Sequence, residues 1–348
     1  MARYCDGLQQ ADRTYRKVLD KSAGMLKSVT GGSEEGLAMA TDMVQALTDL
    51  ILNDATSQAM ISLLSREELK DVNVLHALNV CTLSMMVGRS FDLPDDQLKV
   101  LGLAGLFHDL GEQRVPPAIL KKRGQLLWSE REALQRHVDY SLETVGKLAE
   151  FPEAAREIIR MHHERMDGSG YPLGLRGRQV PLPAQIVMAV DEYDLLINHP
   201  DSGASVTPPE ALSHLYVKGQ SLFQPDVIVA LVQTLSVYPP GTIVQLSDES
   251  YGMVVSINFS VRLKPMVALY DPSAPPDRPR VVNLVEEPNL RIVRSFRKQE
   301  IPAEVAAALD LKRLTGYFIQ SSVDTLTEQG APVCAPQPAV WRRPGAVW

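Results

Sequence analysis

Apolar residues recur at helical spacing from residue 34 to residue 235, and this periodicity limits the fold more than any other feature of the chain. The run VNVLHALNVCTLSMMVGRSF (72–91) is apolar on most sides, which is typical of a buried helix. The run EEGLAMATDMVQALTDLILNDATSQAMISLL (34–64) repeats the same spacing and is read as one helical segment. The expected fold class is therefore mainly α, with the helices packed as a bundle.

Further helices are predicted on both sides of these two runs. Residues 8–29 form a polar helix that ends near the glycines of TGGS (30–33). Ser129 and Glu132 have capping-box spacing and predict the start of another helix. The remaining predicted helices share the 3.6-residue period and span 95–112, 129–149, 152–166, 181–198 and 208–219.

The helical spacing of apolar residues ends at YPPG (238–241). Five short runs follow, each bounded by Gly, Pro, Asp or Asn, and they predict a small β unit: TIVQLS, YGMVVSIN, PMVALYD, RVVNLVE and LRIVRSF. A last helix is expected within 301–320, and the proline-containing tail at 321–348 is expected to be disordered. The predicted organisation is an N-terminal segment, a helical domain, a β domain, a helix and a tail, at 1–33, 34–235, 236–300, 301–320 and 321–348.

Composition narrows the class of function. The formal net charge of −7 argues against general binding of DNA. The three cysteines, Cys5, Cys81 and Cys334, have no metal-ligand spacing, so reduced thiols and a cytoplasmic protein are expected. No apolar run approaches the ~20 residues that a membrane-spanning helix needs.

Five of the seven histidines lie in apolar helical surroundings together with two aspartates. A single histidine on an apolar face is usually a core residue with a satisfied ring. Seven such residues together favour a metal site, because a buried carboxylate without a partner is costly and coordination removes that cost. The candidate metal ligands are His76, His108, Asp109, His137, His162, His163 and Asp191.

The doublets His108–Asp109 and His162–His163 suit two ions rather than one. Adjacent residues on a helix diverge by ~100°, so one member can face one ion and its neighbour a second ion, and a carboxylate can bridge both. Mixed nitrogen and oxygen ligands suit Fe, Mn, Zn, Co or Ni. Two ions about 3.5–4 Å apart form the usual clamp for hydrolysis of a phosphoester.

The second doublet opens the stretch HHERMDGSGYP (162–172), in which two glycines allow positive φ and close approach of a ligand. A helix end followed by a turn would account for the glycines and for Pro172. It would not account for the paired histidines or for Arg165.

These residues resemble the HD-GYP family, a branch of the HD metal-dependent phosphohydrolases. HDLG (108–111) resembles the HD motif, HHERMDGSGYP matches the family signature nearly letter for letter, and LHALNV (75–80) resembles the segment of the first histidine. The resemblance covers about residues 35–235, and VYPPGTIVQLSDESYGMVVSIN (237–258) resembles a β extension found in one subgroup.

The resemblance implies an HD-type helical bundle with a divalent metal centre, most often Fe or Mn, that hydrolyses the bacterial messenger cyclic di-GMP to pGpG or GMP. The seven residues above become the metal ligands, with Asp109 bridging the ions. It further implies a loop that meets the substrate or a signalling-protein partner, formed by Arg165, Asp167, Gly168, Gly170, Tyr171 and Pro172.

The chain departs from the family pattern at three places. Glu112 occupies the position of the usual lysine that meets the substrate phosphate, so Asp109 and Glu112 are the candidate catalytic residues. Val72 stands where members with a third metal have a glutamate, so two ions are expected. The run DLLINHPDSG (194–203) lacks the arginine and tyrosine of the corresponding family segment.

Three functions remain open from the sequence. The first is a two-metal phosphodiesterase acting on cyclic di-GMP. The second, motivated by Glu112 and DLLINHP, is a degenerate relative that binds cyclic di-GMP or a protein partner without turnover. The third is hydrolysis of another phosphoester, such as a different cyclic dinucleotide.

Overall fold

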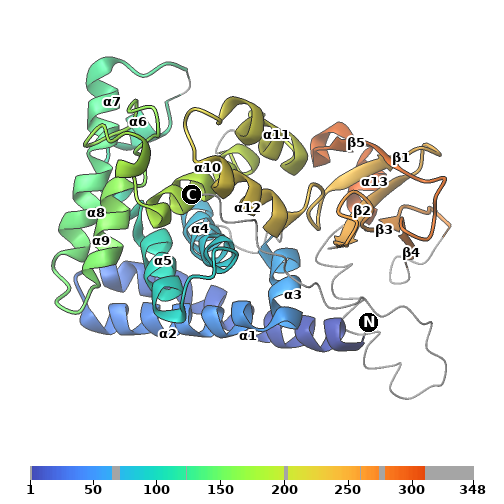
Figure 1. The fold of residues 1–348 in the computed structure, drawn as a ribbon, viewed down its shortest axis with the longest axis horizontal. Coiled ribbons are helices and arrows are strands. Elements are labelled where there is room, and N and C mark those ends of the chain that lie inside the picture. Colours follow the sequence, from blue (N-terminus) through green and yellow to red (C-terminus); the bar gives the residue numbers. More distant parts are fainter. Residues whose placement is uncertain are drawn as a thin grey trace.

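A computed structural model describes residues 2–64, 71–122, 124–199, 203–258, 260–273 and 279–309. The described chain forms a body of helices with a small sheet at one end (Figure 1). The helices of the body are α1 (Ala2–Thr30), α2 (Glu34–Leu52), α3 (Asp54–Leu64), α4 (Val72–Arg89), α5 (Asp95–Phe107), α6 (Pro117–Leu120), α7 (Trp128–Gln135), α8 (His137–Val145), α9 (Glu153–Met161), α10 (Leu182–Ile197), α11 (Pro208–Lys218) and α12 (Pro225–Leu235).

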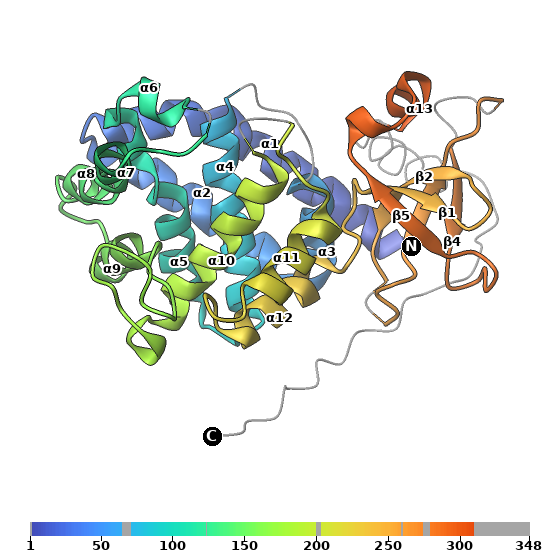
Figure 2. The ribbon, with the colours of Figure 1, turned by 90° about the horizontal axis from the view of Figure 1, so that it is seen from above.

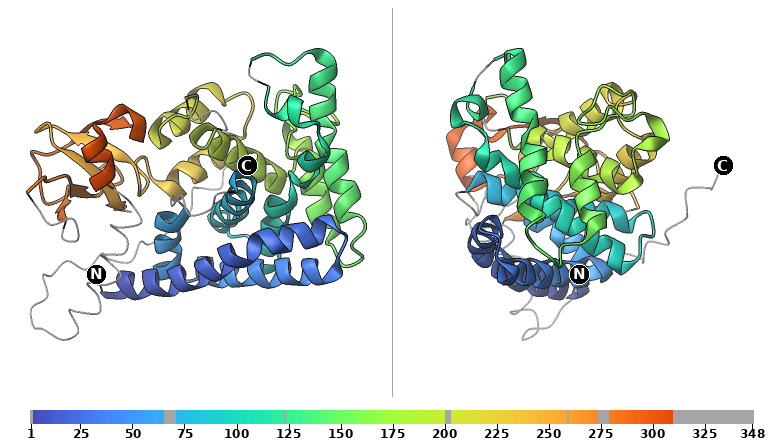
Figure 3. Two further views of the ribbon diagram at one scale, coloured as in Figure 1. Left: turned by 180° about the vertical axis from the view of Figure 1, so that it is seen from behind. Right: turned by 90° about the vertical axis from the view of Figure 1, so that its left-hand side faces the viewer.

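The mainly α fold is confirmed, and α4 is its central element. Both α4 and α10 bury residues around most of their circumference, which explains their continuous apolar sequences. Helix α4 packs against α2, α5, α10 and α12. The long α1 lies along α2 and α3 on one side of the body, as the rear view shows (Figure 3).

Two predicted helices are interrupted. The run 34–64 breaks at Asn53, whose extended backbone (φ −89°, ψ 123°) ends α2, and its Oδ1 accepts from the Thr56 N–H at 3.4 Å. The run 129–149 divides into α7 and α8. The predicted cap at Ser129 and Glu132 is wrong: α7 begins after Leu127, and Glu130 accepts from the Leu127 N–H at 2.7 Å.

All five predicted strands are confirmed, as one antiparallel sheet in the order β4-β3-β2-β1-β5. Its strands are β1 (Ile243–Leu246), β2 (Tyr251–Ser256), β3 (Met266–Leu269), β4 (Arg280–Asn283) and β5 (Ile292–Phe296). Helix α13 (Ala303–Ala308) covers one face, where Val305 packs with Ile243 and Met253. The predicted disordered tail lies outside the described residues.

The sheet contacts the body at the segment between α10 and α11 (Figure 2). Arg297 Nη1 donates to the carbonyls of Gly203 and Ser205, at 3.0 Å each. The hydroxyls of Thr207 and Ser295 lie 3.1 Å apart. The β unit therefore braces the segment that follows α10. No helix in the described part of the chain has the length and apolar character needed to cross a membrane.

Candidate metal centre

Five helices bring the seven candidate ligands together in the middle of the body. Helix α4 carries His76 on its second turn, and α10 carries Asp191. The two doublets do not lie within helices as predicted. Residues 108–109 follow the end of α5, residues 162–163 follow the end of α9, and His137 is the first residue of α8. Helix ends thus converge on the centre, and adjacent residues can turn toward the same point.

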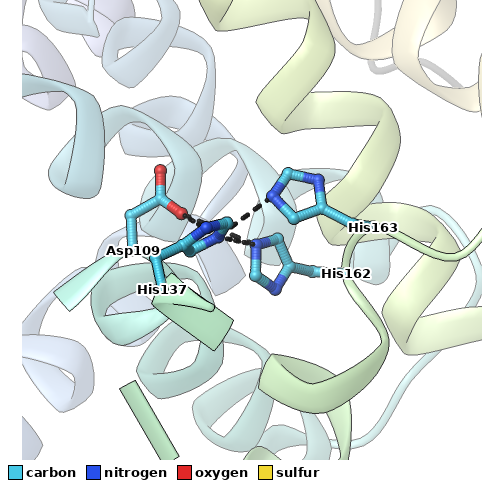
Figure 4. Close-up of side chains that lie close together, drawn as sticks. All are labelled: Asp109, His137, His162 and His163. Carbon is cyan, nitrogen blue, oxygen red and sulfur yellow. Dashed lines mark hydrogen bonds and ion pairs between the residues drawn. The ribbon is translucent and has the colours of Figure 1, made fainter. Parts of the chain in front are cut away.

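The ligand atoms form two groups that share one carboxylate. The first group consists of Asp109, His137, His162 and His163 (Figure 4), and the second of His76, His108, Asp109 and Asp191. Within each group the ligand atoms lie within 4.8 Å of one another. The shared residue is the one expected to bridge two ions.

Asp109 presents one oxygen to each group. Its Oδ1 lies 3.3 Å from His137 Nε2 and 3.5 Å from His162 Nε2. Its Oδ2 lies 3.2 Å from His108 Nε2 and 3.6 Å from the His76 ring. Ligands about 2.1 Å from one ion, in tetrahedral or octahedral geometry, stand roughly 3.0–3.4 Å apart. These spacings fit one ion on each side of Asp109.

Backbone carbonyls fix the tautomer of three histidines. The Nδ1–H groups of His108, His137 and His162 donate to the carbonyls of the third residue before each, at 2.8, 2.7 and 2.6 Å. A carbonyl can only accept, so each Nδ1 carries the proton, and in the neutral ring each Nε2 presents a lone pair. Because hydrogen bonds hold the far side of each ring, the Nε2 atoms are oriented toward the centre.

Lone pairs therefore face one another across the centre. His137 Nε2 lies 3.5 Å from His162 Nε2 and 3.1 Å from His163 Nε2. Asp109 Oδ1 and Asp191 Oδ1 are buried and have no hydrogen-bond partner among the described residues. Cations between these atoms would satisfy all of them, so the residues fit a metal centre.

The charges of the site point to the same chemistry. Burial opposes charge on His108, but the carboxylate of Asp109 outweighs it and raises the pKa of His108 to about 10. Burial lowers the pKa of His162 and of His163, and so favours the neutral form that binds metal. Without metal, His108 is thus protonated against the Asp109 carboxylate, while His162 and His163 are neutral.

Two supporting residues were not anticipated from the sequence. Asp194 Oδ2 accepts from His76 Nδ1 at 2.7 Å, while Asn79 and Asn198 donate to its other oxygen at 2.9 Å each. Ser141 Oγ donates to the His108 carbonyl and accepts from the Gly111 N–H, at 2.8 Å each. The i, i+3 spacing from Asp191 places Asp194 on the same face of α10, and that spacing was the available signal.

The loop after His163 lies over the centre. The Tyr171 ring stacks on the His163 ring with centroids 4.7 Å apart. The backbone N–H of Tyr171 donates to the His163 carbonyl at 3.2 Å. A cis peptide joins Tyr171 to Pro172. The fully buried Glu164 accepts from the N–H groups of Leu173 and Leu175. This carboxylate, also missed from the sequence, holds the loop in place.

The other predicted loop residues differ in their surroundings. Gly168 has φ +80°, and a Cβ on Gly170 would lie 2.4 Å from the Arg165 nitrogen, so both positions require glycine. The exposed Asp167 accepts from Ser169 N–H and Oγ, at 2.9 and 2.6 Å, and so shapes the turn itself. Arg165 is half-buried, and no described residue hydrogen-bonds its side chain.

Glu112 lies in the 3-10 turn Leu110–Arg114 that follows Asp109. Burial, together with the charge of Asp109, raises the pKa of Glu112 to about 7. It belongs to neither ligand group, and no described residue hydrogen-bonds its carboxyl group. An acid therefore stands beside the centre, at the position where the resembling family usually has a lysine.

Known proteins resemble this chain in sequence and in fold. Residues 50–227 match the profile of a family described as "HD domain". The chain is 28% identical over 246 residues to the cyclic di-GMP phosphodiesterase PA4108 of Pseudomonas aeruginosa, covering 71% of this chain and 59% of the relative. It is 33% identical over 149 residues to the cyclic di-GMP phosphodiesterase response regulator RpfG of Xanthomonas campestris, covering 42% and 39%.

A third relative, the 3'3'-cGAMP-specific phosphodiesterase 3 of Vibrio cholerae, is 30% identical over 164 residues, covering 47% of this chain and 35% of the relative. The chain therefore spans less than two thirds of the length of these curated relatives. Among solved structures, Bd1817, a HDG"Y"P protein from Bdellovibrio bacteriovorus, superposes with a TM-score of 0.53 at 20% identity, covering 64% of this chain and 70% of that one. That likeness concerns the fold.

Proposed function

This chain belongs to the HD domain family, and from that premise we propose that it is a two-metal phosphodiesterase that hydrolyses cyclic di-GMP to pGpG or GMP. The main support for this proposal is that two groups of candidate metal ligands share the carboxylate of Asp109. Relatives named as cyclic di-GMP and 3'3'-cGAMP phosphodiesterases support a cyclic dinucleotide as the substrate.

The seven ligand residues would hold the two ions, with Fe or Mn favoured and Zn, Ni or Co as alternatives. When bound, the ions supply an activated water and neutralise charge on the phosphoryl oxygens. Asp109 spaces the two positions, and the backbone carbonyls keep the Nε2 atoms in place. The chain thus fixes the geometry before the substrate arrives.

The loop residues would recognise the substrate. Tyr171, stacked on His163, offers a ring face and a hydroxyl beside the centre. Arg165, whose side chain makes no hydrogen bond to a described residue, offers a cation for a phosphate. Gly168 and Gly170 let the loop fold against Arg176 and against the backbone of residues 163–165, which sets the position of Tyr171.

Glu112 favours a second candidate: a degenerate member of the family that binds cyclic di-GMP or a protein partner without turnover. A carboxylate beside the centre repels a phosphate, unless it is neutral or faces away. Without metal, burial and the charge of Asp109 raise the pKa of Glu112 to about 7. Two cations bound beside it would lower that pKa and favour the carboxylate, which repels a phosphate.

Turnover and metal content should be measured on one sample, purified without oxygen. Cyclic di-GMP and 3'3'-cGAMP are offered separately, and Glu112→Lys is assayed beside the natural chain. Two ions per chain with formation of pGpG or GMP would support the proposal. Two ions without product, with turnover gained by Glu112→Lys, would establish the degenerate protein instead. Absence of bound metal would overturn the phosphodiesterase proposal.

A further inference from the structure

Glu112 faces the metal centre from the 3-10 turn that follows Asp109. Its N–H donates to the Asp109 carbonyl at 2.9 Å, and side chains three residues apart in such a turn lie on the same side. Burial and the charge of Asp109 raise the pKa of Glu112, while the charges of His137 and His108 lower it. These two histidines belong to different ligand groups, so the carboxyl group of Glu112 lies beside both groups.

Helix α8 holds this turn in place. The Gly111 N–H donates to Ser141 Oγ at 2.8 Å, and a Cβ on Gly111 would lie 2.1 Å from the His137 carbonyl oxygen. The turn therefore keeps its distance to a candidate ligand. Glu112 itself is half-buried, and no described residue hydrogen-bonds its carboxyl group. Both carboxyl oxygens are thus available to a molecule bound at the centre.

An ionised acid at this place selects hydrogen-bond donors. A carboxylate can only accept, and it repels a phosphate. In a cyclic dinucleotide the phosphates suit the metal ions and Arg165, so the part of the ligand beside Glu112 must carry N–H or O–H groups. The base edges and the ribose hydroxyls are the parts that do. Two neighbouring donors on one planar edge match the two oxygens of a carboxylate better than a single hydroxyl does.

Tyr171 supplies a surface for a base next to this acid. Burial and the charges of Asp109, Asp191 and Glu112 raise the pKa of Tyr171, so Glu112 lies near the tyrosine as well. The Tyr171 ring stacks on His163 on one side and is only half-buried. Nucleotide bases stack on aromatic side chains and are read along their hydrogen-bonding edges. A base on the accessible part of the ring can direct its edge toward Glu112.

Guanine is the base that fits an ionised acid. Its Watson–Crick edge places the N1–H and the N2 amino group side by side, and both are donors. Adenine has one amino group next to a ring nitrogen that can only accept, and this nitrogen would face a carboxylate oxygen. On the premise of the proposed phosphodiesterase function, we infer that Glu112 determines specificity: it accepts from the N1–H and the N2 amino group of guanine, so the centre prefers cyclic dinucleotides that contain guanine to cyclic di-AMP.

Equilibrium dialysis of GMP, IMP and AMP against the full chain, purified without oxygen, tests this role. The three nucleotides share ribose and phosphate, differ in the base, and contain no phosphodiester that the centre could cleave. We expect GMP to bind roughly ten- to a hundredfold more tightly than AMP, the gain typical of charge-assisted hydrogen bonds. IMP keeps the N1–H and lacks the N2 amino group, so its affinity should fall between the two.

Glu112→Gln should reverse this order. An amide presents one acceptor and one donor side by side, which pair with the amino group and the ring nitrogen of adenine. The loss of a negative charge alone would strengthen the binding of all three nucleotides equally. Glu132→Gln removes a charge from an exposed position on α7 and should leave the order unchanged.

Equal affinities for GMP and AMP in the natural chain would overturn the role of Glu112, and so would a preference for GMP that survives Glu112→Gln. Absence of binding at millimolar nucleotide would overturn it as well. Turnover of cyclic di-GMP, followed on the same sample, separates this inference from the proposed function. Turnover without a preference among the three nucleotides would leave the phosphodiesterase standing, whereas a preference for GMP without turnover would overturn the phosphodiesterase and leave the guanine contact standing.

Discussion

Asp194 Oδ2 lies 2.7 Å from His76 Nδ1, so a carboxylate that is not itself in a ligand group holds one of the candidate metal ligands. Asn79 and Asn198 hold the carboxylate in turn. This arrangement orients the His76 ring and makes its Nε2 a stronger donor to a cation.

Asp194→Asn should weaken metal binding by about 10- to 100-fold, because the ring loses its anionic support. Competition with a chelating dye, at fixed pH, measures the affinity. Asp139→Asn changes an exposed aspartate on α8 and serves as the control. Unchanged affinity in Asp194→Asn would mean that His76 is not a ligand, or that its orientation is fixed by packing alone.

Glu112 should make the metal-free protein less stable as the pH rises. Its folded pKa, about 7, lies above the ordinary value of 4.5, so its contribution to stability is present below pH 4.5 and is lost as the pH rises to about 7. Glu112→Gln cannot ionise, so it should exceed the natural chain in stability by roughly 1–2 kcal/mol at pH 8, after allowance for partial exposure.

Denaturant unfolding at pH 4, 6 and 8, in the presence of a chelator, measures this difference. Glu132→Gln removes one negative charge from an exposed position on α7 and shows what the loss of charge alone contributes. A stability gain of equal size at pH 4 and pH 8 would contradict the assignment, since only an ionisation gives the difference its pH dependence.

Ser141→Ala should cost about 1–3 kcal/mol of stability, because it leaves the Gly111 N–H and the His108 carbonyl buried without partners. The carbonyl belongs to a candidate ligand, so metal affinity should fall as well. Urea unfolding gives the first quantity and metal titration the second. Ser129→Ala, exposed on α7, should change neither. If Ser141→Ala lost the predicted stability but kept its metal affinity, Ser141 would support the fold and not the metal centre.

Periodicity was enough to predict the helical body and the five strands, and residue types in apolar surroundings singled out the seven side chains that lie together in the two candidate ligand groups. Helices α4 and α10 are buried around most of their surface, so their sequences are apolar throughout and the polar His76 and Asp191 stand out. The change of period at YPPG marked the sheet, because strands of four to six residues need turn residues between them.

The interruptions of the helices could not be predicted in the same way. The α2–α3 break and the α7–α8 division depend on backbone angles at Asn53 and Arg136, which apolar spacing does not encode. The Glu164 carboxylate accepts hydrogen bonds from backbone N–H groups nine and eleven residues further along the chain. No side-chain pattern in the sequence marks such bonds. Side-chain types thus identified the candidate ligands, while tertiary contacts decide which groups hold those side chains in place.

Two glycines should respond to alanine in opposite directions. A Cβ on Gly111 would lie 2.1 Å from the His137 carbonyl and 2.5 Å from the Ser141 nitrogen, so Gly111→Ala must push α8 away from the turn after Asp109. We expect a loss of about 1–3 kcal/mol, the range for overpacking, together with weaker metal binding. Gly24, within α1, has no atom within 4 Å of such a Cβ. Gly24→Ala should therefore raise stability by about 0.5–1 kcal/mol through the reduced entropy of the unfolded chain. Chemical unfolding and metal titration of both variants would show whether the contact between residues 111 and 137 sets the spacing of the centre; equal effects of the two substitutions would exclude it.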